Sequence, residues 1–178
     1  DISLMAVPQP VEYTILQDNA AERTRPHIIP LDNGRKMITF IGNGTLLDTS
    51  ERDETNATTL FYSVYDGTNW STPVPVADDG TIDSTPAMKK VGGKVIISWA
   101  DMNAAIDDSE AAKDKLDNFG ISCAVYDIVS GEMGGEITLA DDKFMNLSPQ
   151  INVSGDNLYV SYMKRDLSNV TETADLVD

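Results

Sequence analysis

The sequence predicts an all-β chain built from four-stranded antiparallel sheets of the kind that form β-propeller blades. The first observation behind this prediction is a repeat of about sixty residues. The second is that each repeat holds four short segments rich in β-branched and aromatic residues, which is typical of a blade. The third is the even spread of Gly, Pro, Asn, Asp, Ser and Thr along the 178 residues, as turns between short strands require.

The repeat is clearest in three segments that each begin at a proline. They are RPHIIPLDNGRKMITF (25–40), TPAMKKVGGKVIISW (85–99) and SPQINVSGDNLYVSY (148–162). Pro26, Pro86 and Pro149 are 60 and 63 residues apart, and each segment has a glycine-containing turn and ends in a hydroxyl residue followed by an aromatic one. We interpret each segment as a two-stranded hairpin, in which glycine supplies the positive φ of a tight turn.

Two further strand-like segments follow each of the first two hairpins. The third strands match as LFYSVYD (60–66) and ISCAVYD (121–127), and the fourth as PVPVADD (73–79) and EITLADD (136–142). Asp18, Asp78 and Asp141 each lie eight residues before the next repeat proline. A single sheet of this kind buries its faces by stacking on neighbours, which explains strands that are apolar on both faces. A β-sandwich is the alternative architecture.

We expect one partial β-propeller domain over residues 1–178. Its blades would lie at about 26–79 and 86–142, with an incomplete blade at 149–178 and with 11–19 as the last strand of a preceding blade. Propellers have about four to eight blades, so about three blades indicate a fragment of a larger propeller, or a half-ring completed by a second copy. An unclosed propeller exposes apolar edges, so we expect self-association of open blade edges.

Charge and composition limit the partners. The net charge of −16, from 29 acidic and 13 basic residues, argues against nucleic acid and anionic membranes, and it suits an exported protein, a basic partner or a cation-binding surface. No apolar run is long enough to cross a membrane. The only cysteine, Cys123, allows no intrachain disulfide and is expected to be a small core residue, and a single His27 excludes a histidine-rich metal site. The start at Asp1, without Met or a basic leader, indicates a processed product or an excised piece.

Acidic residues gather in the segments expected on one face of the sheets. These are the long loops between second and third strands, and the links into each new repeat. Clustered carboxylates suit Ca²⁺, and the candidate ligands are Asp101, Asp107 and Asp108, although the sequence has no DxDxDG spacing. The alternatives are solvated surface loops or a short helix over 107–116 that begins with an acidic cap. Similarly, Trp70 and Trp99 could stack on sugars, or pack between sheets.

The stretch SVYDGTNWSTP resembles the Asp-box repeat of bacterial neuraminidases, with Ser63, Asp66, Gly67 and Trp70 in comparable order. In that family the box is a structural turn on the face opposite the active site. The first repeat as a whole, 25–80, resembles the first blade of sialidases, and the style of the repeats is similar to the sialidase-like propellers of large bacterial surface proteins.

The resemblance implies two functions, and a third is open. The first is a non-catalytic binding or display scaffold of a secreted or cell-surface bacterial protein, with a carbohydrate or protein ligand. The second is part of a sialidase-like glycoside hydrolase, in which Arg25 would grip a substrate carboxylate and Asp48 or Asp53 would assist proton transfer. The third is a structural spacer in a long surface protein. We favour the scaffold.

Overall fold

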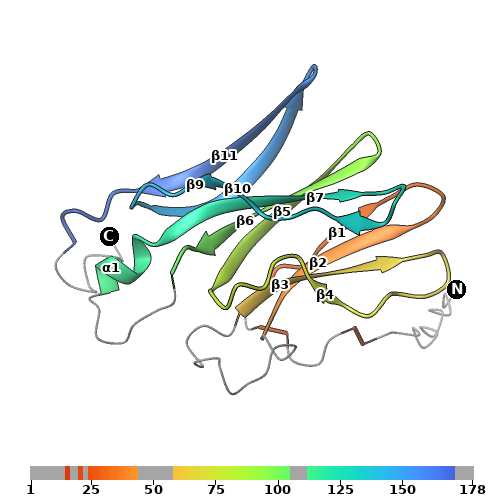
Figure 1. The fold of residues 1–178 in the computed structure, drawn as a ribbon, viewed down its shortest axis with the longest axis horizontal. Helices are drawn as coiled ribbons and strands as arrows, with labels where there is room; N and C mark the ends of the chain where they lie inside the picture. The colour runs from red at the N-terminus through yellow and green to blue at the C-terminus, as the bar shows by residue number, and fades with distance from the viewer. Residues whose placement is uncertain (1–14, 17–19, 22–23, 44–57, 105–111, 171–178) are drawn as a thin grey trace, which may run out of the picture.

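A computed structural model describes residues 15–16, 20–21, 24–43, 58–104 and 112–170 of the chain. The described residues form eleven β-strands and one short helix, α1 (Ala112–Leu116). The strands make three antiparallel sheets, here named sheets A, B and C in chain order (Figure 1). The prediction of an all-β chain with antiparallel sheets is therefore confirmed.

Sheet A contains the first repeat. It consists of β1 (His27–Pro30), β2 (Lys36–Asn43), β3 (Thr58–Tyr65) and β4 (Val74–Pro75), hydrogen-bonded in that order. The predicted hairpin, third strand and fourth strand are all present, but the fourth strand is only two residues long. Residues 44–57, which join β2 to β3, lie outside the described part of the chain.

Sheets B and C contain the second and third repeats. Sheet B consists of β5 (Asp83–Val91), β6 (Lys94–Met102), β7 (Phe119–Asp127) and β8 (Glu132–Met133), and β9 (Ile137–Ala140) also pairs with β7. Sheet C is the hairpin of β10 (Met145–Ser154) and β11 (Asn157–Arg165). The strands of each sheet are consecutive in sequence, as the repeat predicted. The expected strand at 11–19 and the tail at 171–178 lie largely outside the described residues.

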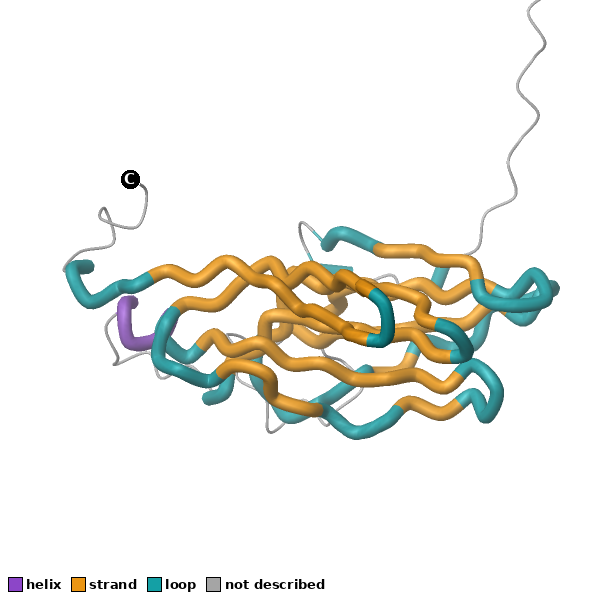
Figure 2. The backbone as a smooth tube through the Cα atoms, turned by 90° about the horizontal axis from the view of Figure 1, so that it is seen from above, coloured by secondary structure: helices purple, strands orange, loops and turns teal. Residues whose placement is uncertain are grey.

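Sheet B lies between sheets A and C, and the strands of all three run along the long axis of the molecule (Figures 1 and 2). The alternation of side chains along β6 explains this packing. Ile97 and Trp99 belong to the core cluster shared with Met37 and Leu60 of sheet A, whereas Ile96 packs with residues of sheet C. A central strand covered on both faces is apolar throughout, which is what the sequence shows here.

The two tryptophans have different environments. Trp99 is fully buried in the core cluster between sheets A and B, which agrees with the packing alternative and not with an exposed surface for sugars. Trp70 is only half-buried, and its ring contacts Tyr65 of its own sheet, with the ring centroids 5.4 Å apart. The prediction of packing between sheets therefore describes Trp99 and is wrong for Trp70, because the turn that carries Trp70 folds back onto β3. Cys123 is buried and free, as expected for a core residue.

The two VYD turns are built in the same way. The Oδ1 atom of Asp66 accepts hydrogen bonds from the backbone N–H groups of Thr68 (2.7 Å) and Asn69 (2.8 Å). The Oδ1 atom of Asp127 accepts from the residues at the same two offsets, Val129 (2.8 Å) and Ser130 (3.0 Å). Each Asp thus satisfies the backbone donors of a tight turn. These aspartates have a structural role in both repeats.

The long loop after β6 and the link into sheet C lie together, as predicted from the four-strand topology. Asn103 Nδ2 donates to Asp141 Oδ1 at 3.0 Å, and Lys143 Nζ donates to Asn118 Oδ1 at 2.9 Å. Helix α1 occupies the end of the region where a short helix was expected, and residues 105–111 lie outside the described part. Within the described ranges, no helix is long and apolar enough to span a bilayer.

Candidate functional site

A pocket of about 420 Å³ opens where the first strands of the three repeats come together. Three of its lining residues are Arg25, Thr85 and Ser148, which are the residues immediately before the three repeat prolines. Residues about sixty positions apart in sequence therefore meet at one place. The repeat itself builds this pocket, because it brings the same position of each unit to a common wall.

The backbone at two of these positions is strained. Thr85 has φ 44° and Ser148 has φ 55°, and both precede a proline. A non-glycine residue with positive φ is uncommon, and such strain costs about 1–3 kcal/mol and persists only where the surroundings hold it. Both residues lie within β-bulges of their strands, and Ser148 N donates to Thr85 Oγ1 at 3.0 Å. The two bulges therefore support each other across sheets B and C.

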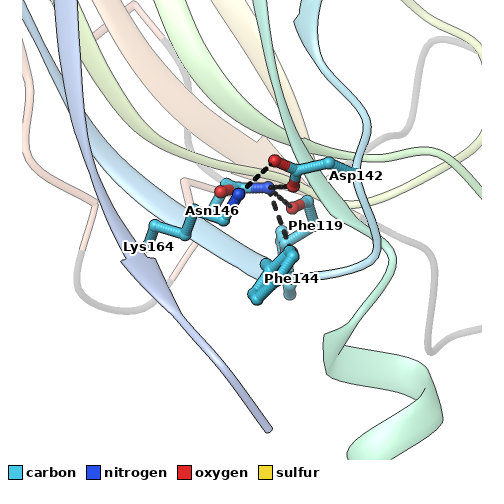
Figure 3. A network of polar contacts seen from close by, with 5 residues as sticks. All are labelled: Phe119, Asp142, Phe144, Asn146 and Lys164. Atoms are coloured by element: carbon cyan, nitrogen blue, oxygen red, sulfur yellow. Dashed lines mark hydrogen bonds and ion pairs between the residues drawn. The ribbon is translucent and has the colours of Figure 1, made fainter. Parts of the chain in front are cut away.

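Next to the pocket, equivalent residues hold successive sheets together. Asp83, which lines the pocket, lies three residues before Pro86, and its Oδ2 accepts from Leu60 N of sheet A at 2.7 Å. Asn146 lies three residues before Pro149, and its Nδ2 donates to Phe119 O of sheet B at 3.1 Å (Figure 3). Each side chain reaches back to the third strand of the preceding sheet. These buried contacts position the sheets that form the pocket wall.

A cluster of carboxylates lies beside Asp83. Oxygen atoms of Asp79, Asp101 and Glu136 all lie within 4.8 Å of one another. The Ser122 hydroxyl, which can donate one hydrogen bond, lies within reach of both Asp101 Oδ2 (3.1 Å) and Glu136 Oε1 (2.7 Å). Asp101 is 3% exposed, whereas Asp79 and Glu136 are exposed. The cluster therefore has a buried base and an open side.

Crowding and burial change the acidity of the two buried carboxyl groups. Burial raises the pKa of Asp83 well above its usual value, against the hydrogen bond from Leu60, and the neighbouring Asp101 adds to the rise. Burial, followed by the hydrogen bond and charge of Glu136, raises the pKa of Asp101 to about 7. In both groups burial is the largest cause of the raised pKa and neighbouring carboxylates add to it, while no basic partner is among the interactions described for either group.

The third repeat has a cation at the corresponding place. Asp142 lies seven residues before Pro149, as Asp79 does before Pro86, and Lys164 lies fifteen residues after Pro149, as Asp101 does after Pro86. There the Lys164 ammonium pairs with Asp142, which also accepts from Asn146 Nδ2 at 3.0 Å (Figure 3). The same two positions of the repeat therefore hold a carboxylate–ammonium pair in sheet C and two carboxylates in sheet B.

Hard cations such as Ca²⁺ bind to carboxylate oxygens, often together with hydroxyl or carbonyl oxygens. Asp79, Asp101 and Glu136 could hold such an ion, and the Oγ of Thr81, 3.2 Å from Asp101 Oδ1, is a further oxygen at the same place. The Asp83 carboxyl group is close enough to interact electrostatically with all three.

The structure brings together only some of the residues that the sequence singled out. Arg25 lies at the pocket and is exposed, and Asp101 lies in the carboxylate cluster. The candidates Asp48, Asp53, Asp107 and Asp108 lie outside the described residues.

Glu136 and Asp79 were not singled out as metal ligands from the sequence. The sequence did hold a hint of this cluster. Asp101 and Lys164 occupy the same position of the repeat but carry opposite charges, so the second repeat has an acid where the third has a base.

Comparison of the sequence with protein-family models and with curated proteins found no match to either. The functional interpretation therefore depends on the geometry of the pocket and of the carboxylate cluster.

Proposed function

We propose that this chain is a set of sialidase-like β-propeller blades that serves as a non-catalytic binding or display scaffold of a secreted or cell-surface bacterial protein. In this proposal sheets A, B and C are three successive blades of a larger propeller. The observation that carries the proposal is the pocket, in which Arg25, Thr85 and Ser148 occupy one repeat position and line one wall.

The chemistry of the pocket favours recognition of a polar ligand. Arg25 offers a guanidinium group, which pairs well with a carboxylate, and Thr58, Thr85 and Ser148 offer hydroxyl groups. Phe119 adds an aromatic surface. A carboxylate-bearing sugar fits this combination, and a protein segment with an acidic side chain presents the same group.

The single carboxyl group among the described lining residues favours binding over hydrolysis. Glycoside hydrolysis ordinarily uses two carboxyl groups on either side of the scissile bond. Among the described lining residues Asp83 is the only carboxylic acid, and its Oδ2 is bonded to Leu60 N. An acid held in this way by the backbone joins two sheets and is poorly placed to transfer a proton.

The binding proposal is tested by titration calorimetry with N-acetylneuraminic acid as the acidic probe and lactose as the neutral one. We expect the acidic sugar to bind, and the Arg25→Gln variant to lose about 1.5–3 kcal/mol of binding free energy, as for a hydrogen bond to a charged group. Lys89→Gln is the control, because it removes one exposed positive charge away from the pocket. Equal binding by wild type and Arg25→Gln would contradict the role of the pocket.

The hydrolase alternative is decided by a separate assay. Wild-type protein incubated with a 4-methylumbelliferyl sialoside should release no more fluorophore than a blank. Release that depends on Arg25 would show that the chain is part of a sialidase-like glycoside hydrolase instead.

We also propose that the carboxylate cluster binds a divalent cation such as Ca²⁺ that supports the scaffold. The comparison of two repeats supports this proposal. In sheet C, Lys164 supplies a positive charge to Asp142, whereas the same two repeat positions of sheet B hold two acidic residues, Asp79 and Asp101. Four close carboxyl groups repel one another, and a bound cation would remove that repulsion.

The cation proposal predicts that millimolar CaCl₂ raises the melting temperature at pH 8, since a ligand of the native state stabilises it. Asp101→Asn should abolish the calcium-dependent part of this rise. Asp156→Asn removes the same charge from the turn between β10 and β11 and should leave the rise intact. A rise of equal size in both variants would reflect general screening of the net charge and would contradict a site at Asp101.

A further inference from the structure

Two charged side chains line the pocket of about 420 Å³, and they do not neutralise each other. Arg25 and Asp83 are the only charged residues among its described lining residues. No ion pair joins them in the described part of the chain, and Arg25 is not among the groups that change the pKa of Asp83. A molecule in this pocket therefore meets a positive and a negative group at separate places on the wall.

Arg25 has no bonding partner within the described ranges. The residue is exposed, and its guanidinium makes neither a hydrogen bond nor an ion pair to any described residue. Thr85 and Ser148, which hold the same position of the next two repeats, are bonded to each other through Ser148 N and Thr85 Oγ1. The guanidinium is thus the open member of this set, and its fork of N–H donors suits a carboxylate.

Asp83 keeps one carboxyl oxygen unused. The residue is only 6% exposed, and its Oδ2 accepts from Leu60 N at 2.7 Å. The second oxygen, Oδ1, has no hydrogen-bond partner among the described residues. Buried polar groups are nearly always hydrogen-bonded, so an unused oxygen on a residue that lines a pocket indicates a donor supplied from outside the protein.

The surroundings of Asp83 favour a positively charged donor. Burial raises the pKa of Asp83 well above its usual value, and the charges of the carboxylate cluster add to the rise. A cation beside this carboxyl group would stabilise its charged form. Thr58 Oγ1 lies next to Asp83, since it donates to the Asp83 backbone carbonyl at 3.3 Å, and its oxygen can accept a further hydrogen bond. An ammonium group fits this place, because it needs only a few acceptors and not the large oxygen set that Ca²⁺ requires.

The rest of the pocket suits a small organic molecule. Its described lining includes the apolar side chains of Ile41, Ile82 and Phe119. The volume of about 420 Å³ lies within the range of about 300–1,000 Å³ that small-molecule sites occupy. An aliphatic chain between two charged ends could contact these side chains while its ends reach Arg25 and Asp83.

We propose that the ligand of this pocket is a zwitterion, a small molecule whose carboxylate pairs with Arg25 and whose ammonium group binds Asp83. This inference rests on the binding function proposed above, and it adds the requirement that the ligand carry a positive charge. An acid alone brings a further negative charge close to the carboxylate cluster, whereas a zwitterion leaves the net charge of the site unchanged.

Titration calorimetry at pH 8 in EDTA compares three probes with the same aliphatic chain: 6-aminohexanoate, hexanoate and hexylamine. Physiological salt screens the general attraction of amines to a chain with a net charge of −16. We expect 6-aminohexanoate to bind about tenfold to a hundredfold more tightly than either singly charged probe, because each of its ends forms a hydrogen bond between charged groups. Glycine should bind more weakly than 6-aminohexanoate, since its two charges are adjacent whereas Arg25 and Asp83 stand apart.

Two variants assign the ends of the ligand. Asp83→Asn keeps an acceptor for Leu60 N but removes the charge, so it should lower the affinity for 6-aminohexanoate about tenfold or more without weakening hexanoate. Arg25→Gln should weaken both 6-aminohexanoate and hexanoate and leave hexylamine unchanged. Asp156→Asn removes one negative charge from the turn between β10 and β11, away from the pocket, and is the matched control.

Asp101→Asn gives a second route to the same answer if far-UV circular dichroism shows that Asp83→Asn does not fold. Asp101 is not among the described lining residues, but its charge acts on Asp83. This variant should reduce the preference for 6-aminohexanoate over hexanoate by a smaller factor than Asp83→Asn.

Two results would overturn the zwitterion. One is a wild type that binds 6-aminohexanoate no more tightly than hexanoate, and the other is an undiminished preference in both Asp83→Asn and Asp101→Asn. If N-acetylneuraminic acid still bound through Arg25 in either case, the proposed binding function would stand without this refinement. If none of the probes bound, the binding function and the zwitterion would both fail.

Discussion

Replacing Trp99 with alanine tests the packing of sheet B against sheet A. The Trp99 side chain is fully buried, and it lies in the core cluster with Met37 and Leu60 of sheet A. Removing a buried tryptophan costs about 3–5 kcal/mol, because the transfer energy of the ring is lost and a cavity remains. For a chain of this size each kcal/mol lowers the melting temperature by about 2–4 °C, so we expect a decrease of roughly 6–20 °C.

Two further variants separate packing from other effects. Trp70→Ala should cost only about 1–2 kcal/mol, because Trp70 is half-buried and its ring contacts Tyr65 alone among the described rings. Trp99→Phe should stay within about 1 kcal/mol of the wild type. The Trp99 Nε1 donor is buried with no hydrogen-bond partner among the described residues, so its removal offsets part of the lost contact. Phe40 occupies the equivalent place in the first repeat.

The assay is urea denaturation followed by far-UV circular dichroism, and the remaining tryptophan of each variant gives a second, fluorescent probe. The decisive quantity is the difference in free energy of unfolding between Trp99→Ala and Trp70→Ala. If Trp70→Ala were the more damaging change, or if Trp99→Ala cost less than about 1 kcal/mol, sheet B would not pack on sheet A through this face.

Two other predictions concern the edge of the site and the packing of β7. In EDTA, Asp83→Asn should be more stable than the wild type at pH 8, and the advantage should shrink as pH falls toward 4. The pKa of Asp83 is raised in the folded state, so the wild type loses stability as the pH rises from about 4 through that pKa. Asparagine carries no charge and can still accept the hydrogen bond from Leu60 N. Urea midpoints of both proteins at pH 4 and pH 8 measure the effect, and an equal difference at the two pH values would contradict it. Gly120→Ala should destabilise by about 1–3 kcal/mol, since its Cβ would collide with the Ala140 carbonyl oxygen, whereas Gly135→Ala meets open space and is the control in thermal unfolding.

The repeat made most of the fold predictable. The three prolines, the glycine turns and the matched VYD segments marked units that the structure shows as consecutive antiparallel strands. Periodicity alone could not give the length of the fourth strand, which is only Val74–Pro75 in sheet A. Pro73 and Pro75 have no N–H to donate, which keeps the regular ladder short, although Val76 N still donates to Leu60 O at 2.8 Å.

The candidate site was only partly predictable. The acidic loops were visible in the sequence, but the cluster depends on which carboxylates the strand register brings together. Asp83 and Asp101 are direct partners in the β5–β6 register, while Glu136 arrives from the segment before β9. The pocket could have been anticipated from the equivalence of Arg25, Thr85 and Ser148, but only once the repeats were known to converge at their first strands.

Amide hydrogen exchange across the three sheets tests the central claim, which is that sheet B is the covered middle layer of three stacked repeats. The account predicts the slowest exchange in β6, around Ser98–Ala100, because this strand is paired on both sides and covered on both faces. Exchange in β6 as fast as in the short strands β1 and β4 at the edges of sheet A would contradict the account.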